Sequence, residues 1–396
     1  MTKTTFIILI TLLLTNCSQQ KSEKVSKSVI ECKIEHNDRM KNAIIVKVDV
    51  NEIEQEKSIN SFSEKMPQLK ETGIDVICIM PVQSILELTS GKYVKEYRKI
   101  DPDSGTAEEL RLMIEKAHNL GMIVVLDWLI NTVDSESSQI PIDYSKKDEQ
   151  AVLSEAFQYW LQEFDIDGFY CNNPEVLGIK FWDKLRLSLN KIKPVILIAG
   201  NNKVPELFVN SFDMNSNTQL SEILEKVIRG QTRTDKLVEY FIIEDSIYAR
   251  SCYRLRQFPF VNERNKPHQD QVKMLSTLLF TLHGMPVISS ELVFMYPGLF
   301  KNLIKLRKEN NLFWSGNEGG NFELLNTDNQ HVFAFKRYSE MADAFVILNF
   351  SAQQQEFIVP RGIAGAYTDY FLGESTVKNE NEMMKLDPWE YKIYLE

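Results

Sequence analysis

The chain has 396 residues, of which 43% are hydrophobic and 25% are charged, and this balance is ordinary for a globular protein with a sizeable core. The length favours more than one domain. The formal net charge of −10 argues against a nucleic-acid partner, because phosphate binding needs a basic face and the sequence shows none.

The first residues have the pattern of a bacterial lipoprotein signal. Lys3 precedes an apolar run over 6–14 that is too short to span a bilayer as a mature helix, and the stretch "LTNC" ends at Cys17. We interpret residues 1–16 as a signal peptide, Cys17 as the lipidated residue and residues 17–41 as a flexible tether. This interpretation places the protein in the bacterial cell envelope, on the outer membrane in preference to the inner one, facing the periplasm or the exterior. A plain signal peptide with an incidental cysteine is the alternative.

The remaining cysteines and the five histidines form no metal motif. Cys32 and Cys252 can pair in an oxidising compartment, but the sequence leaves their pairing open. Cys78 and Cys171 lie in apolar runs and are predicted to be buried thiols. Since no CxxC or HxxxH spacing occurs, we expect no metal site and no cofactor.

From residue 42, apolar runs alternate with amphipathic helical patterns. The predicted strands lie within 42–50, 74–82, 122–131, 166–173, 193–202, 207–214, 256–263 and 284–290. The predicted helices between them include 62–73, 106–121, 151–164, 181–192 and 268–284. Eight strands in such βα repetition predict a (β/α)₈ TIM barrel, which takes about 250 residues. A doubly wound sheet is the alternative, but no GxGxxG opens the first helix.

The pattern changes after a last predicted helix over 296–311. Short strands follow, separated by turn residues, at 331–338, 344–351, 355–360, 366–371 and 391–396. We therefore divide the chain into a barrel over 42–314 and a small C-terminal antiparallel β domain over 315–396.

Several stretches resemble the α-amylase family of glycoside hydrolases (family 13). They include "MPQLKETGIDVICIMPV", "SGTAEELRLMIEKAHNLGMIVVLDWLIN", "FQYWLQEFDIDGFYC" and "LLFTLHGMPVI", and the tail resembles the C-terminal β domain of that family. The resemblance covers nearly all of residues 42–396, in order. It implies a TIM barrel with a reduced or absent inserted domain, followed by a β-sandwich.

The resemblance fails at the catalytic residues. Retaining hydrolysis in that family needs a carboxylate nucleophile and a separate carboxylic acid about 5–5.5 Å apart. The strand-four motif of the family reads roughly DGFRxD, and the matching residues here are Tyr170 and Asn172. The family acid follows the next apolar run, and Gly200 and Asn201 stand there instead. An amide cannot replace the nucleophile, and glycine has no proton to donate.

Two further family motifs are altered. Asn262 and Glu263 stand where the family has a His-Asp pair, which makes Glu263 the match for the third carboxylate. Of the DxxxNH motif, Asp127 and Asn131 remain. Only residues 133–150 separate this strand from the next helix, so the family's long inserted excursion, with its calcium partners, is predicted to be missing. We therefore expect no structural calcium.

The leading hypothesis is a membrane-anchored, α-amylase-like pseudoenzyme of α-glucan metabolism. Its ligand is an α-glucan or maltooligosaccharide, or else a protein partner at the membrane. The candidate ligand-binding residues are Asp127, Asn131, Tyr170, Asn172, Asn201, Asn262 and Glu263.

Two alternatives stay open. Trp128, Tyr170, Tyr93 and Tyr97 offer stacking faces to a sugar, or they are ordinary core and rim aromatic residues. The alternative function is an active α-glucan hydrolase with relocated carboxylates, for which the candidates are Asp127, Glu175 and Glu263.

Overall fold

The structure is a computed structural model. It describes residues 29–34, 38–50, 59–83, 85–88, 91–94, 96–130, 146–200, 204–216, 218–259 and 267–396. For the hairpin of β3 (Ile85–Leu88) and β4 (Gly91–Val94) it describes the backbone alone.

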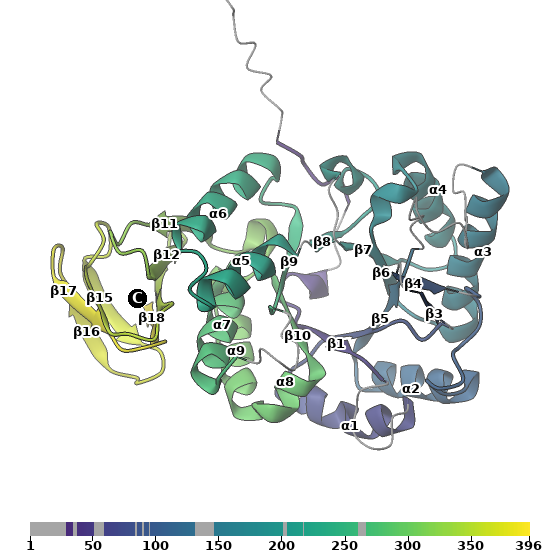
Figure 1. The fold of residues 1–396 in the computed structure, drawn as a ribbon, viewed down its shortest axis with the longest axis horizontal. Helices are drawn as coiled ribbons and strands as arrows, with labels where there is room; N and C mark the ends of the chain where they lie inside the picture. Colours follow the sequence, from purple (N-terminus) through teal and green to yellow (C-terminus); the bar gives the residue numbers. More distant parts are fainter. Residues whose placement is uncertain are drawn as a thin grey trace, which may run out of the picture.

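The first part of the chain folds into a closed barrel of eight parallel strands (Figure 1). Its strands, in chain order, are β1 (Ile45–Val48), β2 (Val76–Ile79), β5 (Ile123–Trp128), β6 (Gly168–Asn172), β7 (Ile196–Gly200), β8 (Met214–Ser216), β9 (Tyr253–Gln257) and β10 (Met285–Ser289). The barrel closes at β1, where Ile45 pairs with Val76 on one side and with Val287 on the other. The predicted TIM barrel is therefore confirmed.

Amphipathic helices surround the barrel (Figure 1). They are α1 (Ile59–Thr72), α2 (Ala107–Asn119), α3 (Lys147–Phe164), α4 (Ile179–Leu189), α5 (Gln219–Ile228), α6 (Asp235–Ile247), α7 (Gln269–Thr281), α8 (Ser290–Met295) and α9 (Pro297–Glu309). Helix α2 begins with a reciprocal capping box, in which Glu109 N–H donates to Thr106 Oγ1 over 3.2 Å and Thr106 N–H donates to Glu109 Oε2 over 2.7 Å. None of the helices in the described part of the chain has the length and apolar character that crossing a bilayer requires.

Two predicted strands are misplaced. Residues 207–214 were expected to form one strand, but Pro205–Phe208 is a 3₁₀ helix and β8 begins only at Met214. The strand expected over 256–263 is β9, which begins at Tyr253. Its start is hidden in the sequence because Arg254 and Arg256 interrupt the apolar pattern, and both are buried only because carboxylates pair with them.

The C-terminal part is antiparallel, as predicted. A six-stranded sheet has the order β11 (Asn321–Leu325), β12 (Val332–Tyr338), β13 (Asp343–Asn349), β18 (Tyr391–Leu395), β15 (Gly365–Asp369) and β16 (Ser375–Lys378). A second sheet pairs β14 (Gln355–Ile358) with β17 (Met383–Leu386). The larger sheet packs on the barrel helices through aromatic side chains: the ring centroid of Phe241 on α6 lies 5.2 Å from that of Phe322 and 6.0 Å from that of Phe333.

A disulfide joins Cys32 to Cys252 across 220 residues of sequence. The bonded segment pairs with the turn between α6 and β9, where Ile30 N–H donates to Ile247 O over 2.8 Å and Ala249 N–H donates to Ile30 O over 2.9 Å. Cys252 immediately precedes β9, so the N-terminal segment is fixed at the amino ends of the barrel strands.

Replacing Cys32 by serine is expected to lower the free energy of unfolding by about 2–4 kcal/mol, because the crosslink closes a long loop in the unfolded chain. Urea denaturation of both proteins measures the difference. Adding a reductant should bring the wild-type midpoint down to that of the variant and should leave the variant unchanged. Equal midpoints without reductant would contradict the prediction.

Candidate functional site

Polar side chains gather at the carboxyl ends of β5 and β6, where barrel enzymes place their catalytic groups. Asn172 Nδ2 donates to Asp127 Oδ1 over 2.6 Å. Asp127 is 3% exposed, and its other oxygen lies 3.5 Å from Lys47 Nζ on β1. Asp127 is thus held on one side by an amide and on the other by an ammonium group.

Lys47 brings a positive charge into the centre of this end of the barrel. Its Nζ lies 3.7 Å from the ring centroid of Tyr170, which is a close cation–π contact. Burial alone would lower the pKa of Lys47, but the neighbouring Tyr170 and Asp127 outweigh burial, so its pKa lies above the ordinary value. Burial raises the pKa of Asp127, and Lys47 and Asn172 offset part of that rise. Lys47 is therefore charged at neutral pH.

The hydroxyl of Tyr170 continues the network across the barrel. It donates to Ser216 Oγ on β8 over 2.9 Å and accepts from Gln257 Nε2 on β9 over 2.6 Å. Tyr170 is 2% exposed. Its ring is therefore part of the interior and does not present a free face to a ligand.

Gly200, at the end of β7, makes room for Tyr170. A Cβ atom at this position would lie 2.5 Å from Tyr170 Cε1 and 2.9 Å from Asn172 Oδ1, and real Cβ atoms do not approach other atoms so closely. Asn172 and Gly200 are paired in the β6–β7 register. Any side chain at position 200 would therefore require the Tyr170 ring to move.

Two family models match the chain, one to each part. The α-amylase catalytic-domain model matches residues 58–152, and the maltogenic-amylase C-terminal-domain model matches residues 322–393. Residues 58–152 thus resemble the α-amylase catalytic domain, and residues 322–393 resemble the C-terminal domain of a maltogenic amylase.

Curated relatives agree with this assignment. α-Amylase 2 of Dictyoglomus thermophilum is 21% identical over 278 residues, which cover 58% of this chain and 48% of that protein. The maltogenic α-amylase of Bacillus acidopullulyticus is 24% identical over 394 residues, covering 80% and 65% respectively. The chain thus matches about half to two thirds of the length of these relatives.

Solved structures share the fold. A noncanonic maltogenic α-amylase from Thermotoga neapolitana superimposes with a TM-score of 0.77 at 19% identity, over 90% of this chain and 99% of that one. An α-amylase from Geobacillus thermoleovorans, solved with acarbose, superimposes with a TM-score of 0.72 at 16% identity, over 91% and 99% respectively.

The barrel brings together only some of the residues that the sequence singled out. Asp127 contacts Asn172, and Lys47 contacts both Asp127 and Tyr170. Trp128 is fully buried instead and stacks on Phe157, with ring centroids 4.2 Å apart. Tyr97 lies parallel to Trp128 and is partly buried. The predicted residues that lie outside the described side chains are Cys17, Tyr93, Asn131, Asn201, Asn262 and Glu263.

Sequence reasoning missed Lys47, Ser216 and Gln257. A signal was present for Lys47, because it is the single charged residue within the otherwise apolar stretch "AIIVKV". Ser216 and Gln257 gave none, since the strands that carry them were misplaced. Glu175, a candidate relocated carboxylate, lies in the 3₁₀ turn after β6, and its Oε2 is buried without a partner in the described part of the chain.

A cavity of about 280 Å³ opens beside the network, at the carboxyl ends of β1, β9 and β10. Its lining includes Lys47, Asp49, Gln257, Phe258, Glu291 and Tyr296. Aromatic rings next to carboxylate and amide groups suit a sugar, which has both apolar faces and hydroxyl groups. The cavity therefore offers room for a small ligand at the carboxyl ends of the barrel strands.

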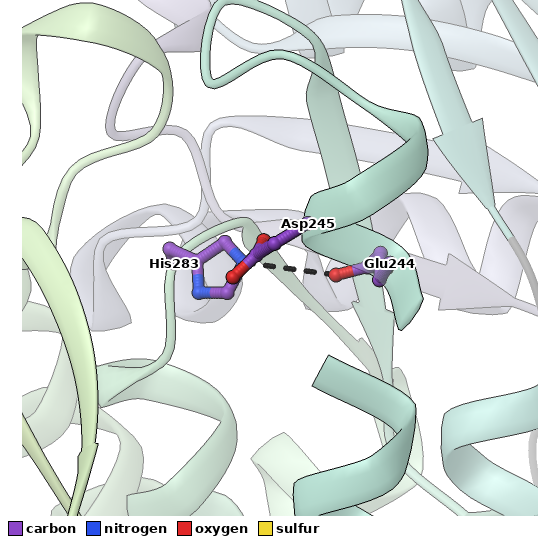
Figure 2. Close-up of side chains that lie close together, drawn as sticks. All are labelled: Glu244, Asp245 and His283. Carbon is purple, nitrogen blue, oxygen red and sulfur yellow. Dashed lines mark ion pairs between the residues drawn. The ribbon is translucent and has the colours of Figure 1, made fainter. Parts of the chain in front are cut away.

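A second polar cluster lies at the opposite, amino ends of the strands. Figure 2 shows Glu244, Asp245 and His283 close together, and their ligand atoms lie within 4.8 Å of one another, as in a metal site. Glu244, however, already accepts from Arg256 over 2.7 and 2.9 Å and from Tyr240 Oη over 2.7 Å. Guanidinium groups thus already supply the positive charge that a metal ion would supply.

Proposed function

We propose that this α-amylase-family protein binds an α-glucan or maltooligosaccharide without hydrolysing it. The proposal rests on what occupies the carboxyl ends of β6 and β7. At the end of β6, Asn172 donates a hydrogen bond to Asp127, and at the end of β7, the Tyr170 ring fills the space next to Gly200. In the family these positions hold the nucleophile and the acid, and neither residue here can perform that step. Two of the relatives are named an α-amylase and a maltogenic α-amylase, which supports an α-glucan as the class of ligand.

The cavity beside Lys47 is the proposed sugar site. It lies next to the degenerate centre and keeps aromatic, carboxylate and amide groups in its lining. The Lys47 ammonium and the Tyr170 ring fill the centre of the barrel at the carboxyl ends of its strands. A ligand in the cavity would therefore lie against β10 and α8.

The second candidate function is α-glucan hydrolysis with relocated carboxylates, which the activities named in the relatives favour. Of its candidate residues, Asp127 is engaged by Asn172 and Lys47, so it is poorly placed to attack a sugar. Glu175 and Glu263 remain for this alternative.

We expect no turnover of maltoheptaose or of a p-nitrophenyl α-glucoside by the purified protein during a day of incubation, because the nucleophile and acid positions hold Asn172 and Gly200. The release of reducing sugar measures hydrolysis of maltoheptaose, and the absorbance of p-nitrophenol measures hydrolysis of the glucoside. Sustained turnover that disappears in Glu263→Gln or Glu175→Gln would establish the hydrolase and sink the non-hydrolytic proposal.

Binding is tested separately by calorimetric titration with maltoheptaose. Glu291→Gln removes a carboxylate from the cavity lining and should weaken binding about tenfold, in the range of a lost hydrogen bond to a charged group. Glu309→Gln makes the same change at an exposed position at the end of α9 and should bind like the wild type. Equal affinities of the two variants would place the sugar elsewhere.

The cell-envelope location remains part of the proposal, resting on the "LTNC" stretch that ends at Cys17. A multiply acylated cysteine would hold the protein firmly on a membrane. The protein should sediment with membranes, and Cys17→Ala should lose both the lipid mass and the sedimentation. A Cys17→Ala protein that stays membrane-bound with unchanged mass would refute the anchor.

A further inference from the structure

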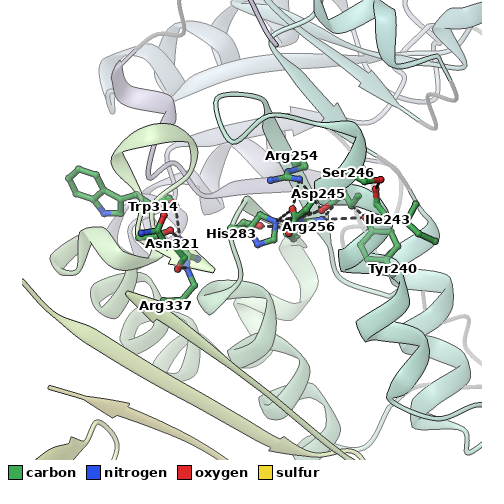
Figure 3. A network of polar contacts seen from close by, with 12 residues as sticks. Tyr240, Ile243, Asp245, Ser246, Arg254, Arg256, His283, Trp314, Asn321 and Arg337 are labelled. Atoms are coloured by element: carbon green, nitrogen blue, oxygen red, sulfur yellow. Dashed lines mark hydrogen bonds and ion pairs between the residues drawn. The ribbon is translucent and has the colours of Figure 1, made fainter. Parts of the chain in front are cut away.

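Positive charge is concentrated where the barrel meets the C-terminal domain, although the chain as a whole has a net charge of −10. Arg337 on β12 is electrostatically coupled to four other arginines: Arg250, Arg254, Arg256 and Arg307. All of these except Arg250 are at most 4% exposed. Figure 3 shows Arg254 and Arg256 gathered with Asp245 and His283 on the barrel side, and Arg337 beside Asn321 on the other side.

The carboxylates of this region do not balance its arginines. Glu244 and Asp245 pair with Arg254 and Arg256. Between described residues, no carboxylate pairs with Arg250, Arg307 or Arg337, which donate to carbonyl, amide and hydroxyl oxygens instead. Two carboxylates against five guanidinium groups leave three positive charges in excess, and uncompensated buried charge is costly.

The pKa values of Arg337 and Arg307 are lowered, as expected for buried arginines in a region with excess positive charge. Burial, together with the neighbouring arginines, lowers the pKa of Arg337 well below its usual range. Burial lowers the pKa of Arg307 to about 9. Both groups would be stabilised in their charged form by an anion nearby.

Donor groups remain available around a cavity of about 320 Å³ in this region, which is room for roughly ten water molecules. Its lining includes Arg250, Arg254, His283 and Arg337. The Arg254 side chain hydrogen-bonds within the described residues through Nη1, to Asp245, and its Nε and Nη2 groups donate no hydrogen bond there. His283 is 8% exposed, and its Nδ1 has no partner in the described part of the chain.

We propose that this cavity is a binding site for a phosphate group, either free phosphate or a small phosphomonoester. Arginine forks match the tetrahedral oxygens of phosphate through paired N–H donors, and a dianion offsets most of the excess charge. The site lies at the amino ends of β9 and β10 and is separate from the proposed sugar cavity at their carboxyl ends.

The test is calorimetric titration of the full chain with sodium phosphate, glycerol 3-phosphate and sodium chloride at constant ionic strength, which keeps general screening equal. One saturable phosphate site per chain is expected. Tighter binding of glycerol 3-phosphate would identify a phosphomonoester as the occupant, and tighter binding of free phosphate would identify the inorganic ion. No saturable heat with either, or equal affinity for chloride, would overturn the proposal.

Two variants should change the phosphate affinity in opposite directions. Arg250→Gln should weaken it about tenfold or more, whereas Asp245→Asn should strengthen it, because the Asp245 carboxylate competes with an anion for Arg254. Arg361→Gln removes the same charge as a control and should bind like the wild type, because Arg361 is exposed and has no hydrogen bond or ion pair with another described residue. Loss of fold would weaken binding in both cavity variants, so a tighter Asp245→Asn complex separates the site from a structural effect. Equal affinities of Arg250→Gln and Arg361→Gln would contradict the site.

Discussion

The double variant Asn172→Asp, Gly200→Glu is expected to hydrolyse no maltoheptaose and to be less stable than the wild type. It places carboxyl groups at the two positions that the proposal assigns to the nucleophile and the acid, but the Cβ atom at position 200 would lie 2.5 Å from Tyr170 Cε1. Overpacking of this kind typically costs about 1–3 kcal/mol. Even if the chain adjusts, the ammonium of Lys47 and the ring of Tyr170 occupy the centre of the site.

The stability part of this prediction can be isolated with a smaller change. Gly200→Ala should destabilise the wild type by about 1–3 kcal/mol. The same substitution made in a Tyr170→Ala variant should cause no further loss of stability, because the ring that it would meet is absent. Gly298→Ala is the control, since a Cβ atom there meets nothing within 4 Å. Urea denaturation of the single and double variants gives the coupling energy. The prediction would be contradicted if Gly200→Ala left the free energy of unfolding unchanged, or if the Asn172→Asp, Gly200→Glu variant hydrolysed maltoheptaose. Either result would show that the Tyr170 ring moves aside easily.

Glu244→Gln is expected to lower the free energy of unfolding by about 3–5 kcal/mol, the largest effect of any single substitution proposed for this chain. Glu244 is 7% exposed and is the partner of Arg256 Nη1 and Nη2 and of Arg254. Without its charge, these buried guanidinium groups lose their main counter-charge. Glu239→Gln on the same helix is the control, because the Glu239–Lys236 pair is exposed and solvent screens it, so its loss should hardly change the stability.

The effect of Glu244→Gln should depend on pH. Burial alone would raise the pKa of Glu244, but Arg256 and Arg254 hold it well below its usual value. A carboxyl group whose pKa is lowered by folding contributes stability above its unfolded pKa, and this contribution is lost as the pH falls toward the folded pKa. The difference between wild type and Glu244→Gln should therefore be full at neutral pH and should shrink below about pH 4. A constant difference between neutral pH and about pH 3 would show that Glu244 is not held as a charged partner.

The sequence by itself predicted the class of fold, which the structure confirms, and it led to the hypothesis that two positions lack the family's catalytic groups. Apolar runs alternating with amphipathic helices are a local pattern, and local pattern is enough to predict repeated βα units. Asn172 and Gly200 can likewise be read directly from the sequence, so the hypothesis that they replace a nucleophile and an acid needed only the comparison of short motifs.

Only the tertiary structure shows which side chains surround Asn172 and Gly200. Lys47, Ser216 and Gln257 come from three separate strands, and only barrel closure brings them to Tyr170. The same holds for the arginine-rich cavity between the barrel and the C-terminal domain. Charged residues in β9 look unfavourable for a buried strand until Glu244, from the preceding helix, pairs with them. Side-chain partners that are distant in sequence carry no local signal, because burial of a polar group is favourable only in the presence of a partner that the fold supplies.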